Sequence, residues 1–178
     1  MTDGVLSGKT GFTGDAGYCY VCACEKDEKT FVVSLLGCGW PNNKGYKWKD
    51  SLKLLDYGED NFDYEKFWKE LKFPEVPVKD GVEKNITFGD TAVVSGIPSV
   101  SEKEKNKKIL MKKGEKISCR LEMPEKLQAP VKKGNRIGTL IYSLGEEELA
   151  SYPVLADRNV EKVSYGWCVD QVFHDFFH

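Results

Sequence analysis

The sequence predicts an α+β protein in three consecutive parts. These are an antiparallel sheet with a helix in residues 1–72, a small all-β sandwich in residues 73–160, and an amphipathic terminal helix in residues 161–178. Three strand-like stretches joined by short turns open the chain. Short alternating apolar stretches recur through its middle, and apolar and aromatic residues at helical spacing close it. A length of 178 residues fits this organisation.

The first part contains strand candidates at residues 5–12, 18–25 and 30–36, separated by a Gly- and Asp-rich turn and by a charged turn. Sequential strands joined in this way indicate an antiparallel meander. The third stretch is continuously apolar, which is typical of a buried central strand. Residues 46–57 then predict a helix that ends at Gly58.

The predicted helix has Trp48, Leu52 and Leu55 on one face, which we expect to pack on the sheet. Residues 59–72 carry aromatic residues among charges and fit either a short second helix or an ordered linker. From residue 76 the pattern becomes that of short strands, as in a sandwich or barrel. The expected strands are residues 86–88, 91–94, 108–111, 116–123, 136–142 and 148–154. The charged run 101–108 predicts a solvated loop.

Charge and hydropathy exclude several classes of function. The formal net charge is −2, so a nucleic-acid partner has no electrostatic support. No apolar run approaches the roughly 18 residues that a membrane-spanning helix needs. The first residues have neither the basic nor the apolar region of a signal peptide. We therefore expect either a fragment of an exported parent or a chain that stays in the cytoplasm.

Six cysteines raise the question of a metal or redox site. Cys19 and Cys22 have the spacing of zinc ligands, but in a strand Cys19 faces away from Cys22 and Cys24. A tetrahedral site needs four converging ligands, and the two histidines, His174 and His178, are far away in the sequence. The sequence therefore predicts free cysteines that behave as small buried apolar side chains, and no metal site.

The most specific motif is Lys9-Thr10-Gly11, the Lys-Thr-Gly signature of penicillin-recognising serine enzymes. These enzymes also use a nucleophilic serine in a Ser-x-x-Lys motif and a second motif of the form Ser-x-Asn. The 178 residues contain neither of these motifs. The sequence thus predicts one wall of such a site without its nucleophile.

Together these blocks resemble a low-molecular-weight penicillin-binding protein, the serine-type D-alanyl-D-alanine carboxypeptidase family. The first part resembles the C-terminal portion of the family's penicillin-binding transpeptidase-like (β-lactamase-like) domain, and the middle and the end resemble its C-terminal β domain and its membrane-associating helix. The resemblance rests on residues 8–19, 39–41, 48–58, 127–134, 138, 152–154 and 172–178. The family's N-terminal portion, which includes the nucleophile, has no counterpart here.

The resemblance implies a role for five residues. Lys9 would lie over the nucleophile and the substrate carboxylate, and the Thr10 hydroxyl would hydrogen-bond that carboxylate. Gly11 would let the substrate backbone approach the strand, and the backbone N–H of Phe12 would donate in the oxyanion hole. Lys47 falls near an arginine that holds the carboxylate in some members, although a lysine lacks the bidentate fork.

Three functional hypotheses follow. The first is a fragment of a carboxypeptidase that acts on peptidoglycan pentapeptides and binds β-lactams at the extracytoplasmic face of the bacterial cytoplasmic membrane. It needs no cofactor, and this chain alone is expected to be inactive. The second is a non-catalytic module that binds a protein or places residues 161–178 at a membrane surface, where aromatic residues favour binding and acidic residues oppose it. The third is a homo-oligomer that exchanges strands through an unpaired sheet edge.

Overall fold

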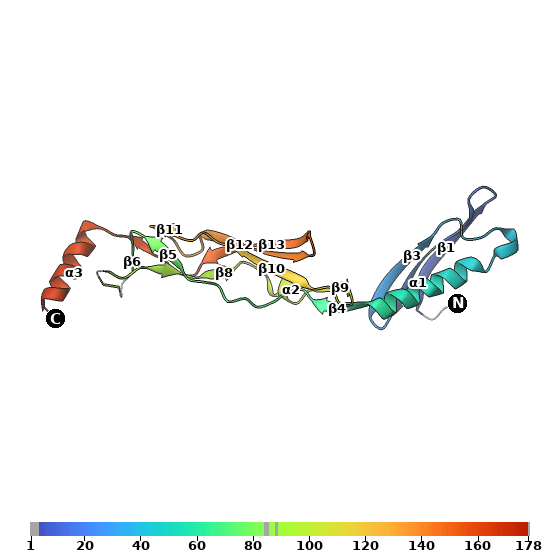
Figure 1. Ribbon diagram of the computed structural model, residues 1–178, viewed down its shortest axis with the longest axis horizontal. Coiled ribbons are helices and arrows are strands. Elements are labelled where there is room, and N and C mark those ends of the chain that lie inside the picture. The colour runs from blue at the N-terminus through green and yellow to red at the C-terminus, as the bar shows by residue number, and fades with distance from the viewer. Residues whose placement is uncertain (1–3, 84–85, 88, 178) are drawn as a thin grey trace. The chain divides into compact units, whose positions relative to one another are not determined.

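The computed structural model describes residues 4–83, 86–87 and 89–177 (Figure 1). The chain forms two compact units. The first comprises Met1–Lys66 with Lys108–Glu115, and the second comprises Phe67–Lys107 with Lys116–His178. Both consist mostly of strands with few helices, which confirms the expected class in outline. Residues 108–115 lie with the first unit, whereas the sequence analysis placed them in the β sandwich.

The first unit opens with a three-stranded antiparallel sheet in the order β1-β2-β3, which confirms the predicted meander. The strands are β1 (Val5–Thr13), β2 (Gly17–Lys26) and β3 (Lys29–Leu35). The turn before β2 depends on Gly17, whose φ is +68° and whose added Cβ would lie 2.8 Å from the Gly39 oxygen. The expectation of a central third strand was wrong. β3 is an edge of this sheet, and its Val32 is 71% exposed.

A helix covers β2 and β3 and closes the core of this unit (Figure 1). After a short 3₁₀ turn, η1 (Pro41–Asn43), α1 runs over Tyr46–Asn61. Leu55 is buried as expected, but Trp48 and Leu52 are half exposed. Gly58 does not end the helix. It lies inside α1. A Cβ added at this position would lie 2.9 Å from the Phe31 ring, so a residue without a side chain suits this close contact.

Residues 59–72 form no second helix, and only residues 67–72, which carry neither helix nor strand, fit the alternative of an ordered linker. The end of α1 passes directly into β4 (Phe62–Lys66), which pairs antiparallel with β9 (Lys108–Lys112). The carboxylate of Asp63 on β4 forms an ion pair with the ammonium of Lys29 at 2.7 Å. The charged strand β4 is therefore held by a partner more than forty residues away, which local patterns cannot show.

The second unit contains short sheets that surround an apolar core. Its larger sheet has the order β10-β12-β13-β8, its smaller one the order β11-β5-β7, and β14 pairs with β6. Leu140, Tyr142 and Val154 are fully buried in the larger sheet. The strands are β5 (Val76–Lys79), β6 (Gly81–Val82), β7 (Val93–Val94), β8 (Gly96–Pro98), β10 (Ile117–Glu122), β11 (Leu127–Gln128), β12 (Arg136–Leu144), β13 (Glu147–Ala156) and β14 (Glu161–Lys162).

Two helices complete the second unit, and both differ from expectation. The charged run is not only a loop, since it contains α2 (Glu102–Lys105), whose start is fixed by reciprocal hydrogen bonds between Ser101 and Glu104. The terminal helix α3 covers only Tyr165–Phe177, because residues 161–162 belong to β14. Residues 86–87 are not a strand, and residue 88 of that prediction lies outside the described residues.

Gly138→Ala should destabilise the second unit. Gly138 lies in β12, and an added Cβ would stand 2.5 Å from the backbone oxygen of Glu122, which cannot move without disturbing β10. Overpacking of this kind costs about 1–3 kcal/mol. Thermal unfolding followed by circular dichroism should show a lowered Tm. Gly166→Ala in α3 is the matched control, because the atom nearest its added Cβ is 3.9 Å away. An equal Tm in both variants would contradict the packing argument.

Candidate functional site

The Lys-Thr-Gly motif lies on β1, at the edge of the first sheet. Lys9, Thr10 and Gly11 stand opposite Val21, Tyr20 and Cys19 of β2. In the part of the chain that the structure describes, β1 has no partner strand on its other side, and every residue from 6 to 13 is exposed. The motif therefore lies on an open strand edge, where backbone donors and acceptors are available to a ligand or another strand.

The alternation of the strand distributes the motif over both faces of the sheet. Thr10 stands on the face that carries the buried Tyr20, whereas Lys9 and Gly11 face the opposite side. A hollow of about 880 Å³ lies on the α1 side and is lined by Thr10, Tyr20 and Trp48 among others. A second hollow of about 380 Å³ is lined by Thr10 and Gly11 and by Cys19. Lys9 reaches both hollows.

Phe12 and Gly11 are the other two predicted site residues on β1. The Phe12 ring packs on the Tyr18 ring with centroids 4.6 Å apart, which fixes the strand next to the first turn. Apart from Gly11 itself and its two neighbours in the chain, no residue has an atom within 4 Å of the Cβ that a side chain at Gly11 would have. The structure thus leaves room beside Gly11, the position at which the resemblance implies a substrate backbone.

Lys47 is the one predicted site residue that lies elsewhere. Its side chain is buried, with 7% of the residue exposed, and its ammonium donates to the Lys44 oxygen at 3.2 Å. The same ammonium lies 4.1 Å from the centre of the Tyr18 ring, a cation–π contact. Lys47 lines neither hollow beside β1. Its assignment as a carboxylate ligand stays a prediction, and that role would require the side chain to leave these contacts.

All six cysteines are free, and those on β2 follow the expected alternation. Cys22 and Cys24 are buried on the α1 side, and Cys19 faces the other way. Burial raises the pKa of Cys24 to about 11, and burial together with a hydrogen bond to Cys22 raises the pKa of Tyr20 to about 12. Among the described residues no three potential ligands cluster around a metal position.

Sequence reasoning missed a contact of Cys38. Its thiol donates to a carboxylate oxygen of Asp50 at 3.2 Å, which ties the loop before η1 to α1. Burial and the neighbouring carboxylate both raise the pKa of this thiol. No local signal marks the pair, because twelve residues separate the two positions.

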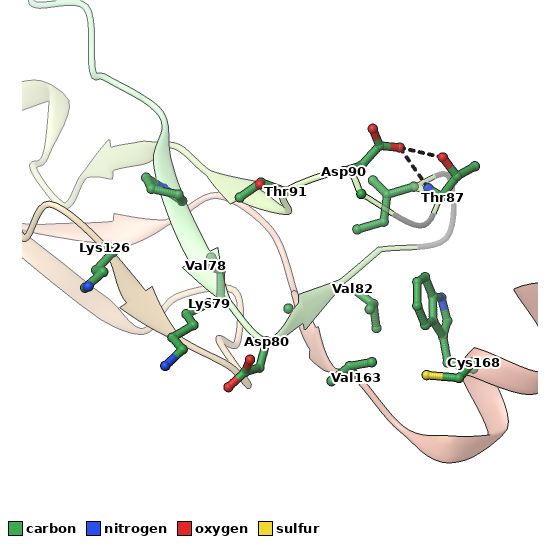
Figure 2. A pocket seen from close by; sticks show the side chains of 15 residues that line it. Val78, Lys79, Asp80, Val82, Thr87, Asp90, Thr91, Lys126, Val163 and Cys168 are labelled. Atoms are coloured by element: carbon green, nitrogen blue, oxygen red, sulfur yellow. Dashed lines mark hydrogen bonds between the residues drawn. The ribbon is translucent and has the colours of Figure 1, made fainter.

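A further hollow, of about 480 Å³, lies in the second unit and is lined by residues of β5 and β6, by residues 86–87 and 89–91, and by the start of α3 (Figure 2). Its two carboxylates already have partners. Asp90 accepts from the backbone and the hydroxyl of Thr87 at 2.8 and 2.9 Å, and Asp80 accepts from Gln128 at 3.0 Å. No sequence motif points to this hollow.

The terminal helix α3 exposes large apolar side chains. Phe176 is 84% exposed, and Tyr165 and Val172 are also exposed. In the described part of the chain, no helix has both the length and the apolar character needed to cross a membrane.

Known proteins are similar in sequence to this chain. Residues 75–162 match the family model described as penicillin-binding protein 5, C-terminal domain. The chain is 27% identical over 166 residues to the D-alanyl-D-alanine carboxypeptidase DacF of Bacillus subtilis, which covers 91% of this chain and 39% of that protein. It is 31% identical over 146 residues to the D-alanyl-D-alanine carboxypeptidase DacA of Haemophilus influenzae, which covers 80% of this chain and 34% of that protein.

A solved structure extends the similarity to three dimensions. The crystal structure of the D-alanyl-D-alanine carboxypeptidase DacD from Francisella tularensis aligns with a TM-score of 0.51 and 25% identity, covering 92% of this chain and 38% of that chain. The chain thus spans no more than about two fifths of the proteins that it matches here. Over most of its length the chain therefore resembles part of the D-alanyl-D-alanine carboxypeptidases among the penicillin-binding proteins, and residues 75–162 match the C-terminal domain of penicillin-binding protein 5.

Proposed function

We propose that the chain is the C-terminal part of a serine-type D-alanyl-D-alanine carboxypeptidase that trims peptidoglycan pentapeptides during cell-wall synthesis. The observation that carries this proposal is β1, which presents Lys9-Thr10-Gly11 on an open edge with a hollow on each face. The nucleophilic serine would belong to the larger portion of the relatives that this chain does not match. The intact protein would act at the extracytoplasmic face of the bacterial cytoplasmic membrane.

In the proposed reaction, Lys9, Thr10 and Phe12 each have one role. A serine hydroxyl supplied by the unmatched portion attacks the carbonyl that precedes the terminal D-alanine, D-alanine leaves, and water hydrolyses the acyl-enzyme. The ammonium of Lys9 stabilises negative charge near the nucleophile and the substrate carboxylate. The Thr10 hydroxyl donates to that carboxylate, and the Phe12 N–H donates to the developing oxyanion. β-Lactams would acylate the same serine.

Labelling with a fluorescent penicillin tests this proposal. The isolated chain should form no covalent adduct, because the Lys-Thr-Gly strand supplies no nucleophile of its own. A chimera that joins the unmatched N-terminal portion of the Bacillus subtilis relative to this chain should label. Lys9→Ala in the chimera should slow acylation by about 100-fold or more, the scale for losing an electrostatic stabiliser. Lys49→Ala, at an exposed position on α1, is the matched control.

Three outcomes would contradict the proposal. One is an acyl adduct on the isolated chain, seen by mass spectrometry. Another is a chimera that labels at the same rate with and without Lys9. A chimera that does not label although it unfolds cooperatively would also argue against the assignment.

A second candidate function rests on α3. Its exposed Tyr165, Val172 and Phe176 suit burial in the interface of a lipid bilayer. We propose that α3 holds the protein at a membrane surface. This role would persist in a non-catalytic module and is therefore separable from the carboxypeptidase assignment.

Association of two copies is a third proposal, supported by the open edge of β1. Light scattering should then give twice the mass of one chain. Pro in place of Lys9 would remove a backbone donor and should restore the monomer mass. A measured mass of one chain at high protein concentration would contradict this proposal.

A further inference from the structure

Lys47 is buried at the start of α1, which is an uncommon place for a lysine side chain. Besides its hydrogen bond to the Lys44 oxygen, its ammonium lies 4.1 Å from the centre of the Tyr18 ring and 5.2 Å from that of the Trp48 ring. The face of an aromatic ring carries negative potential and attracts a cation, more strongly where water is excluded. Lys47 and the Tyr18 ring therefore hold each other in place.

Tyr18 connects Lys47 to the end of the motif strand. It stands opposite Phe12 in the pairing of β1 with β2, and the two rings pack with centroids 4.6 Å apart. The loop before η1 fixes the backbone of Tyr18. Its N–H donates to the Gly39 oxygen at 2.8 Å, and its oxygen accepts from the Cys38 N–H at 2.7 Å. Lys47, Tyr18 and Phe12 thus form one contact chain that runs from α1 to β1.

Phe12 is the residue whose N–H is the donor to the oxyanion in the proposed reaction. That N–H belongs to the peptide bond between Gly11 and Phe12. Glycine restrains such a bond little, and the space beside Gly11 is open. In the described part of the chain β1 pairs with β2 alone, so one strand edge gives no support. The packing of the half-exposed Phe12 ring on Tyr18 therefore helps to set the direction of the donor.

We propose that Lys47 is a positioning residue for this oxyanion donor and acts on Phe12 through the Tyr18 ring. The proposal rests on the carboxypeptidase function proposed above, and it differs from the role of carboxylate ligand that the resemblance implies for Lys47. A carboxylate ligand strengthens binding of the intact substrate or penicillin. An oxyanion donor acts when negative charge develops on the attacked oxygen. Loss of Lys47 should therefore slow acylation and leave noncovalent binding unchanged.

Acylation of the chimera by a fluorescent penicillin at several concentrations separates these two roles. It gives the acylation rate constant and the dissociation constant of the noncovalent complex. Lys47→Met keeps a long side chain without the charge. It should lower the rate constant by about tenfold or more, because small displacements of a catalytic group have large effects, and the dissociation constant should stay the same. Lys49→Met, at an exposed position on α1, is the matched control and should change neither quantity.

Substitutions of Tyr18 test whether Lys47 acts through this ring. Tyr18→Leu removes the ring and should lower the acylation rate constant as Lys47→Met does. Adding Lys47→Met to Tyr18→Leu should cause no further loss, because the effects of residues in one contact chain are not additive. Tyr18→Phe keeps the ring and should retain the rate constant. Additive losses in the double variant would show that Lys47 acts by another route.

A measurement on the chain itself keeps the test decisive if a chimera fails to fold. In amide NMR spectra of the isotope-labelled chain, Lys47→Met should displace the Phe12 resonance, and Lys49→Met should leave it in place. A Phe12 resonance that does not respond to the loss of Lys47 would overturn the proposal, as would a raised dissociation constant at an unchanged rate constant. A chimera that folds with Lys47 unchanged and does not label would contradict the proposed function instead, and the amide spectra alone would then decide whether Lys47 orders Phe12.

Discussion

Leu140→Ala should be among the most destabilising single substitutions in the second unit, lowering its free energy of unfolding by about 2–5 kcal/mol. Leu140 is fully buried on β12, which lies between β10 and β13 in the larger sheet. Truncation there removes apolar contacts and leaves a cavity that two flanking strands prevent from collapsing. Urea unfolding followed by the fluorescence of Trp68, which packs on Tyr142 with centroids 5.4 Å apart, should report the change.

Ile97→Ala is the control for this substitution. Ile97 also lies in the larger sheet, on the edge strand β8, but it is half exposed. We expect a change within about 0.5 kcal/mol, as for most surface substitutions. If the two variants had the same midpoint and the same m value, the core assigned to this unit would be wrong.

Local patterns predicted the elements whose stability is local. The three opening strands and their turns are visible in the sequence because Gly and Asp residues at the turn positions and the apolar runs between them act within a few residues. β10, β12 and β13 lie close to the predicted ranges for the same reason. The capped helix α2 was missed although Ser101 and Glu104 have the capping-box spacing, because the charge of that run outweighed the signal.

Pairings between distant segments were not predictable. β4 is a charged segment whose strand conformation depends on β9. Gly58 has the sequence signature of a helix end, and only the Phe31 ring beside it explains its place within α1. The apolar run of β3 resembles a central strand, yet it borders solvent in this chain. In each case a tertiary contact, or its absence, decided the outcome.

In the candidate site, too, features set by local sequence were predictable and features set by distant contacts were not. Lys9, Thr10, Gly11 and Phe12 were found from a motif, and their placement on one open strand follows from local structure. Lys47 was assigned by resemblance alone, and the structure buries its ammonium beside Tyr18. The alternation of β2 predicted that Cys22 and Cys24 share a face. Their separation of 3.8 Å depends on rotamers that the packing of α1 selects, so the sequence could not give it.

The double substitution of Val172 and Phe176 by serine should abolish most binding of the chain to lipid vesicles. Both side chains are exposed on α3, so their loss removes apolar area without opening the core of the second unit. Burial of each in a bilayer interface is worth at most about 1.5–3 kcal/mol. The pair therefore accounts for at most about 3–6 kcal/mol, which sets an upper limit of roughly 100- to 10,000-fold on the loss of affinity. Sedimentation with vesicles at several lipid concentrations measures it.

Three accompanying results distinguish a membrane helix from one that packs on its own unit. Binding should change little between low and high salt, because acidic residues on the helix, such as Asp170, give no attraction to anionic headgroups. The Tm of the double variant should stay within about 2 °C, the scale expected from surface substitutions of about 0.5 kcal/mol. Val32→Ser, at an apolar position on β3 whose exposure lies between those of Val172 and Phe176, should leave vesicle binding unchanged. A double variant that melts several degrees lower and still sediments with vesicles would show that α3 stabilises its own unit and does not bind the bilayer.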